Sequence, residues 1–137
     1  AEAMLGAGDG NARVFHGQFA VGELRALAGR AAVSIGGDSG PLHLAATGGT
    51  PIVALFGSTL PVRSMPWRDP RSFAEAVEGG PLPCRPCNQR TCEPGDFRCL
   101  AAIAPERVAA AAERALASRR PAAGTAPLRG DWRALHA

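Results

Sequence analysis

Gly36-Gly37-Asp38-Ser39-Gly40-Pro41-Leu42-His43 is a glycine-rich stretch that separates an apolar run from a segment rich in leucine and alanine. Residues 31–35, just before it, are typical of a strand in a parallel sheet, and residues 42–46 favour a helix. Pro41 suits the first turn of a helix, where the amide that it lacks would have no intrahelical partner. The stretch therefore predicts a strand, a tight turn and a helix start, which together indicate an α/β fold.

The same turn predicts a binding site for an anion. Backbone N–H groups near residues 39–42 would point out of the helix N-terminus, at the positive end of the helix dipole, where a phosphate is stabilised. Asp38 can brace the turn by accepting hydrogen bonds from nearby amides. His43 falls in the first turn of the helix and can donate to the same anion. The alternative is a capped helix with a satisfied histidine.

Other segments extend the α/β pattern on both sides of the turn. Arg13-Val14-Phe15-His16-Gly17 is typical of a short strand, and an apolar stripe predicts a helix over 21–29. Residues 52–56 form a continuous apolar run, as in a buried parallel strand. With the strand at 31–35 they predict a βαβαβ unit, whose ligand binds at the carboxyl ends of the strands. A last amphipathic helix is expected over 105–118.

Length and composition limit the classes of protein that fit. The 137 residues suffice for one domain, and the formal net charge is +3 with every basic residue an arginine. The arginines are scattered and tyrosine is absent, which disfavours nucleic-acid binding. No apolar stretch reaches the roughly 20 residues of a membrane span. Because the chain starts at Ala1, we expect a fragment, with a ragged end at 1–12, one domain at 13–118 and a flexible tail at 119–137.

All four cysteines lie within residues 84–99, at Cys84, Cys87, Cys92 and Cys99. Four thiolates at this spacing can surround one tetrahedral metal ion, and a loop with little apolar content gains order by doing so. Two disulfides or four free thiols are the alternatives. The short Cys-x-x-Cys spacing suits metal ligation or redox chemistry better than a framework of disulfide bonds. We therefore expect a structural zinc or iron site in a Cys-rich insertion, and no cofactor for catalysis.

Two adjoining motifs carry a resemblance to a known family. Asp38-Ser39-Gly40-Pro41-Leu42-His43-Leu44-Ala45-Ala46, followed by Gly49-Thr50-Pro51-Ile52-Val53-Ala54-Leu55-Phe56-Gly57, resembles the signature of glycosyltransferase family 9, the heptosyltransferases. The resemblance implies a Rossmann-like parallel sheet with flanking helices, as the C-terminal, donor-binding half of a GT-B glycosyltransferase. Residues 57–67 resemble the family's Gly-Pro-Thr-Asp-Pro loop imperfectly. Ser58 and Leu60 stand where relatives commonly carry proline and aspartate, which weakens the case for a polar role of this loop.

The resemblance also implies an activity and its partners. Family members transfer a sugar, typically heptose from ADP-heptose, to the lipopolysaccharide core, and such an enzyme works in the cytoplasm at the inner face of the inner membrane. Peripheral membrane contact would then be made by the full enzyme. The implied general base belongs to an N-terminal domain that this chain does not contain, so no catalytic residue is assigned and the chain alone is expected to be inactive.

The implied donor-binding residues are Asp38, Ser39, Gly40, His43 and Phe19. The turn and the imidazole would stabilise the charge that develops on the departing diphosphate. In relatives the residue that matches Phe19 lies near the nucleotide base, so Phe19 would form an apolar wall for adenine. The alternative for Phe19 is a staple residue that packs on its own helix.

Two other classes of function fit parts of the sequence. A non-catalytic module that binds nucleotide sugars would use the same turn. A small metal-binding interaction domain would use the cysteines, with the glycine turn only as a helix start. The second alternative leaves the match from Asp38 to Gly57 unexplained.

Overall fold

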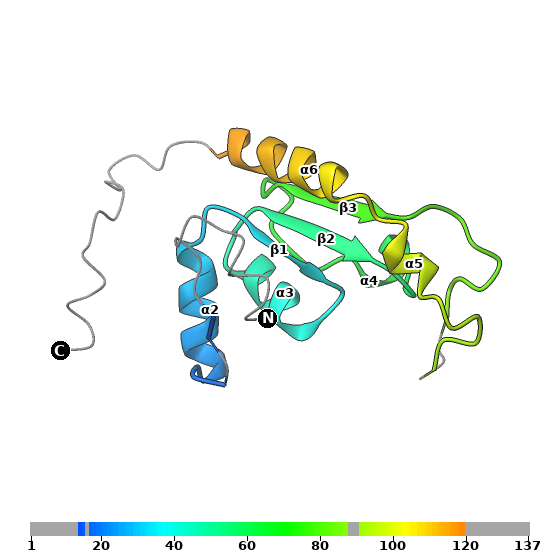
Figure 1. The fold of residues 1–137 in the computed structure, drawn as a ribbon. Helices are drawn as coiled ribbons and strands as arrows, with labels where there is room; N and C mark the ends of the chain where they lie inside the picture. Colours follow the sequence, from blue (N-terminus) through cyan, green and yellow to red (C-terminus); the bar gives the residue numbers. More distant parts are fainter. Residues whose placement is uncertain (1–13, 16, 88–90, 120–137) are drawn as a thin grey trace.

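A computed structural model describes residues 14–15, 17–87 and 91–119 of the chain. Its elements are, in chain order, α2 (Val21–Arg30), β1 (Ser34–Gly37), α3 (Gly40–Thr47), β2 (Ile52–Phe56), α4 (Pro61–Ser64), β3 (Ala74–Glu78), α5 (Arg98–Ala101) and α6 (Pro105–Ala117) (Figure 1). The predicted end at 1–12 and nearly all of the predicted tail at 119–137 lie outside the described residues. None of the described helices combines the length and the hydropathy of a membrane span.

The strands form one parallel sheet in the order β1-β2-β3. The central strand, β2, pairs Ile52 with Ser34 on one side and with Ala74 on the other. Four of its five side chains are fully buried, because a central strand covered on both faces needs an uninterrupted apolar sequence. This confirms the α/β fold with a Rossmann-like parallel sheet and flanking helices.

Helices cover the two faces of the sheet (Figure 1). Leu42 and Ala46 of α3 pack with Ile52, Ala54 and Phe56 on one face. Ala111 and Ala115 of α6 pack with Val53 and Val77 on the other face. Successive residues of a strand point to opposite faces, so the two apolar clusters alternate along β2.

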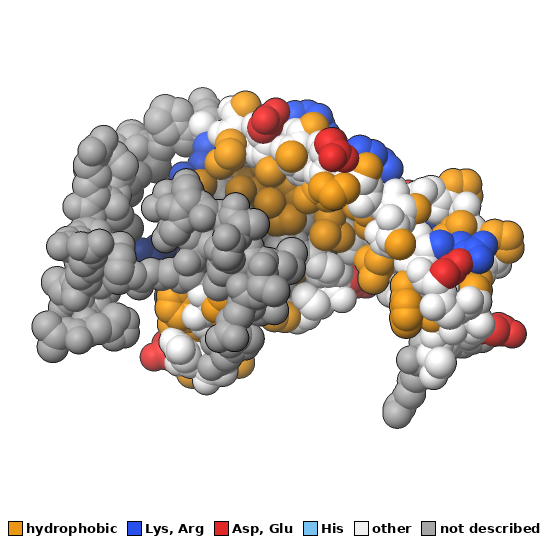
Figure 2. All heavy atoms as spheres, viewed as in Figure 1, with side chains coloured by type: hydrophobic (Ala, Val, Ile, Leu, Met, Phe, Trp, Pro, Cys, Tyr) orange, Lys and Arg blue, Asp and Glu red, His pale blue; other side chains and the backbone are white. Residues whose placement is uncertain are grey.

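The helix α2 and the edge strand β1 are less buried. No residue of α2 is fully buried, and the helix lies against α3. The loop after α3 also holds it, because the Thr50 hydroxyl donates to the Ala28 carbonyl over 2.7 Å. Ile35 of β1 is 48% exposed, because α6 packs mainly on β2 and β3. Figure 2 shows hydrophobic side chains that remain open on the face beside α6.

The predicted boundaries differ from the structure at the first two strands. Val14 and Phe15 belong to no strand, so the strand predicted at 13–17 is wrong for its described residues; Arg13 and His16 lie outside them. The Phe15 ring instead packs against Phe19, with 5.2 Å between centroids. The strand predicted at 31–35 begins only at Ser34, because the Ala31 amide closes α2 by donating to Ala28. The third strand of the sheet is therefore β3, which the sequence did not predict.

Candidate functional site

The glycine turn lies at the carboxyl end of β1, as predicted. The Asp38 amide donates to the Leu55 carbonyl over 3.3 Å, which continues the pairing with β2. The amides of Leu42 and His43 donate to the Ser39 carbonyl and close the first turn of α3. Among the described residues, the amides of Ser39 and Gly40 have no acceptor in the protein. The amides open to an anion are thus these two, and the broader expectation for residues 39–42 is wrong for Leu42.

Asp38 and His43 form a pair beside these amides. The His43 Nε2 atom lies 3.2 Å from Asp38 Oδ1, and the two side chains are 44% and 19% exposed. Asp38 was expected to brace the turn through backbone amides, but in the structure it interacts with side chains. Since Oδ1 meets Nε2, the ring nitrogen left to face a ligand is Nδ1.

The loop after β2 completes the surroundings of Asp38. Partial burial by itself would raise the pKa of the Asp38 carboxyl, but hydrogen bonding from Thr59, His43 and Ser64 and the charge of His43 outweigh it, so the pKa lies below its ordinary value. Although Ser58 and Leu60 weakened the case for a polar role of this loop, Thr59 and Ser64 from the same segment lower the pKa of Asp38. Part of it forms the short helix α4, which brings Ser64 back toward the turn.

Phe19, the predicted wall for adenine, lies just before α2. It is 38% exposed and contacts the Phe15 ring. A separate groove of about 430 Å³ runs between α2, β1 and α3, and Ser39, Pro41 and Leu42 line its end near the turn. Phe19 is not among the residues that line this groove, so its contact with a base stays a prediction.

The Cys-rich segment docks at the carboxyl ends of β2 and β3. A Cβ atom at Gly57 would lie 2.6 Å from Leu100 of α5, and one at Gly79 would lie 2.9 Å from Ala102. These two glycines therefore let α5 approach the strand ends closely. Sequence reasoning missed this contact, because nothing in the local sequence links either glycine to residues 98–102, which lie 19 or more positions away.

The four cysteines line one cavity of about 340 Å³, together with Ser58 and Arg85. Cys84 is exposed, the other three are half-buried, and all four are free thiols. No three His, Cys, Asp or Glu side chains of the described residues are placed to hold a metal ion. As placed, the thiols do not fit a metal centre, and the tetrathiolate site remains a prediction.

The model of glycosyltransferase family 9 (heptosyltransferase) matches residues 9–97. Lipooligosaccharide heptosyltransferase 2 of Campylobacter jejuni subsp. jejuni serotype O:2 is 35% identical over 71 residues, which are 52% of this chain and 21% of that protein. Its counterpart from serotype O:6 is 32% identical over 71 residues, 52% of this chain and 22% of that protein. The match thus spans about a fifth of the length of these relatives. No solved structure matches the chain.

Proposed function

Because the chain belongs to glycosyltransferase family 9, we propose that it forms the donor-binding part of a glycosyltransferase of the heptosyltransferase type. The donor would be a nucleotide diphosphate sugar, with ADP-heptose as the expected member. The acceptor would be the lipopolysaccharide core, and the enzyme would act in the cytoplasm at the inner face of the inner membrane. The names of the two Campylobacter relatives support the sugar and the class of acceptor.

One observation carries the proposal for the donor site: an imidazole and two amides without an acceptor among the described residues lie at one end of one helix. The Ser39 and Gly40 amides stand at the N-terminus of α3, where the helix dipole favours negative charge. A doubly protonated His43 would donate Nε2–H to Asp38 and Nδ1–H to a phosphate oxygen. We therefore assign the diphosphate of the donor to this turn.

The chemistry of transfer explains why such a site helps. The acceptor hydroxyl oxygen forms a bond to the anomeric carbon, and the bond from that carbon to the diphosphate oxygen breaks. The electron pair leaves with the nucleoside diphosphate, and the hydroxyl proton passes to a general base. Because negative charge grows on the diphosphate, donors aimed at it stabilise the transition state more than the bound substrate.

We assign the general base to a part of the full-length protein other than the described residues. Asp38 is the carboxylate closest to the site, but it is engaged with His43, Thr59 and Ser64. The lowering of its pKa favours the charged form of the carboxyl, which suits an orienting group better than a proton acceptor. The chain alone is therefore expected to bind the donor without transferring its sugar.

Calorimetric titration of the chain with ADP and with UDP tests the proposal. We expect ADP to bind, and the Asp38→Asn and His43→Ala variants to bind it roughly tenfold or more weakly, as for the loss of a hydrogen bond to a charged group. Asp69→Asn is the matched control, since this carboxylate pairs with Arg71 on another loop. Equal affinity in Asp38→Asn, His43→Ala and wild type would contradict the assignment of the site.

A further inference from the structure

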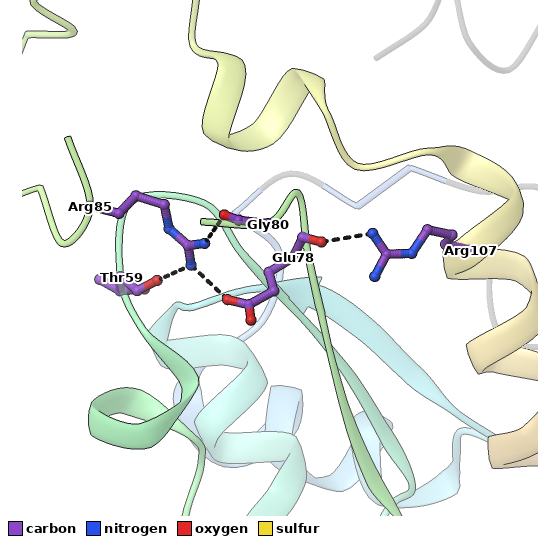
Figure 3. Close-up of polar contacts among 5 residues, drawn as sticks. All are labelled: Thr59, Glu78, Gly80, Arg85 and Arg107. Carbon is purple, nitrogen blue, oxygen red and sulfur yellow. Dashed lines mark hydrogen bonds and ion pairs between the residues drawn. The ribbon is translucent and has the colours of Figure 1, made fainter. Parts of the chain in front are cut away.

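Arg85 lies between the first two cysteines, yet its side chain is only 4% exposed. Its guanidinium donates to three oxygens: Nη1 to the Gly80 carbonyl over 2.7 Å, and Nη2 to the Thr59 carbonyl and to Glu78 Oε2, each over 2.8 Å (Figure 3). Thr59 follows β2, whereas Glu78 ends β3. The guanidinium therefore bridges the loop that follows β2 and the end of the neighbouring strand β3.

This arrangement is costly for a merely structural contact. Burial of a guanidinium is offset only when its donors are satisfied, and the Arg85 Nε–H is buried without a partner. Glu78 is itself held from the other side, since Arg107 of α6 donates to its carbonyl over 2.8 Å (Figure 3). The Arg85 side chain is thus anchored at the end of β3, which α6 holds in turn, and the part that it positions is the loop after β2.

Two hydrogen bonds fasten that loop to the Cys-rich segment. Besides the bond from Arg85 to the Thr59 carbonyl, the Cys87 amide donates to the Ser58 carbonyl over 2.9 Å. The Thr59 side chain is among the groups that lower the pKa of the Asp38 carboxyl, and Asp38 Oδ1 lies 3.2 Å from His43 Nε2. A continuous path therefore runs from Arg85 through Thr59 and Asp38 to the imidazole of the glycine turn.

We propose that Arg85 is a positioning residue for the anion site, holding the loop after β2 so that Thr59 orients the Asp38 carboxylate toward His43. The inference rests on the proposed function, because it takes the glycine turn as the place where the diphosphate binds. It also gives the Cys-rich segment a role, since this segment supplies the residue that fixes the geometry of the donor site.

The test compares two ways of cutting the path in the 137-residue chain. Arg85→Gln removes the anchor, and Thr59→Val removes the hydroxyl while keeping the size of the side chain and its carbonyl. We expect each variant to bind ADP about five- to twentyfold more weakly than wild type. The double variant should bind ADP almost as well as the single variant with the lower affinity, because both substitutions interrupt the same series of contacts. Thr59→Ser restores the hydroxyl and should restore affinity. Arg71→Gln, an exposed arginine, is the control and should bind as wild type.

A second readout does not depend on nucleotide. Titration of the Asp38 carboxyl carbon by NMR should show a higher midpoint in Arg85→Gln and in Thr59→Val than in wild type, and no change in Arg71→Gln. An unchanged midpoint in folded Arg85→Gln overturns the positioning role, whether or not ADP binds. Failure of wild type to bind ADP, with shifted midpoints, overturns the proposed donor site but keeps the positioning role. If Arg85→Gln does not fold, Glu78→Gln removes one ion pair of the same guanidinium. An unchanged titration midpoint of Asp38 in Glu78→Gln would likewise overturn the positioning role.

Discussion

The imidazole of His43 and the carboxylate of Asp38 meet at 3.2 Å across the turn that joins β1 to α3. Asp38 precedes α3 and His43 lies in its first turn, so the pair connects the two sides of the helix N-terminus. Asp38 is the less exposed partner and is held by two hydroxyl side chains as well. The imidazole is therefore the member of the pair that is free to face a ligand.

The first prediction concerns the acid side of the stability curve. Because the pKa of Asp38 is lower in the folded chain than its ordinary value of 3.8, its ionisation stabilises the fold above that value. This stabilisation is lost as the pH falls through the lower, folded pKa. Thr59→Val should raise the folded pKa toward its ordinary value, so that less of the stabilisation is available at neutral pH.

Urea unfolding between pH 2 and about pH 6 measures this effect. Wild type should gain more stability than Thr59→Val as the pH rises through this interval, while Thr59→Ser should follow wild type. Parallel curves for wild type and Thr59→Val would show that the Thr59 hydroxyl does not stabilise the charged carboxylate.

The second prediction concerns the close contact between the end of β2 and α5. A Cβ atom at Gly57 would lie 2.6 Å from Leu100, so Gly57→Ala should push α5 and the Cys-rich segment away from the sheet. We expect a loss of about 1–3 kcal/mol in the free energy of unfolding, as for overpacking elsewhere. Thermal or urea unfolding gives this value directly.

Two further variants identify the cause of that loss. Gly22→Ala adds the same methyl group in α2, where nothing lies within 4 Å, and should not destabilise the chain. Leu100→Ala combined with Gly57→Ala makes room for the new Cβ and should recover part of the stability. If Gly57→Ala is as stable as wild type, α5 does not pack on the strand end as described.

The third prediction concerns metal binding at the cysteines. Their spacing predicts one zinc or iron ion per chain, although the described side chains are not placed to hold one. Elemental analysis of the purified chain should give about one equivalent, and replacing Cys84 and Cys87 together by serine should remove it. A metal-free wild type with four titratable thiols would refute the tetrathiolate interpretation.

Much of the fold follows from local sequence. The strand Ile52–Phe56 and the helix that starts at Pro105 lie where the apolar run and the amphipathic stripe predict them, because both patterns are uninterrupted and bounded by proline or glycine. The strand Ala74–Glu78 was missed. Its sequence has two alanines and two glutamates, which carry little β propensity, and only its pairing with β2 makes it a strand.

The site was predictable only in part, for a related reason. Asp38, Ser39, Gly40 and His43 are close in sequence, so a local motif identifies them together. Thr59 and Arg85 reach the same region from loops that only the parallel sheet brings together. An arginine between two cysteines has no local pattern that indicates burial, and its role emerges from three contacts with residues 5 to 26 positions away.

The central claim is that a diphosphate binds at the glycine turn, and the most direct test is an amide NMR titration of the ¹⁵N-labelled chain with ADP. The Ser39 and Gly40 signals should move most, because their amides have no acceptor among the described residues and would donate to the phosphates. The same titration of His43→Ala should require more ADP for the same change. Saturable shifts that leave Ser39 and Gly40 unmoved, or no shifts at all in the folded chain, would contradict the account.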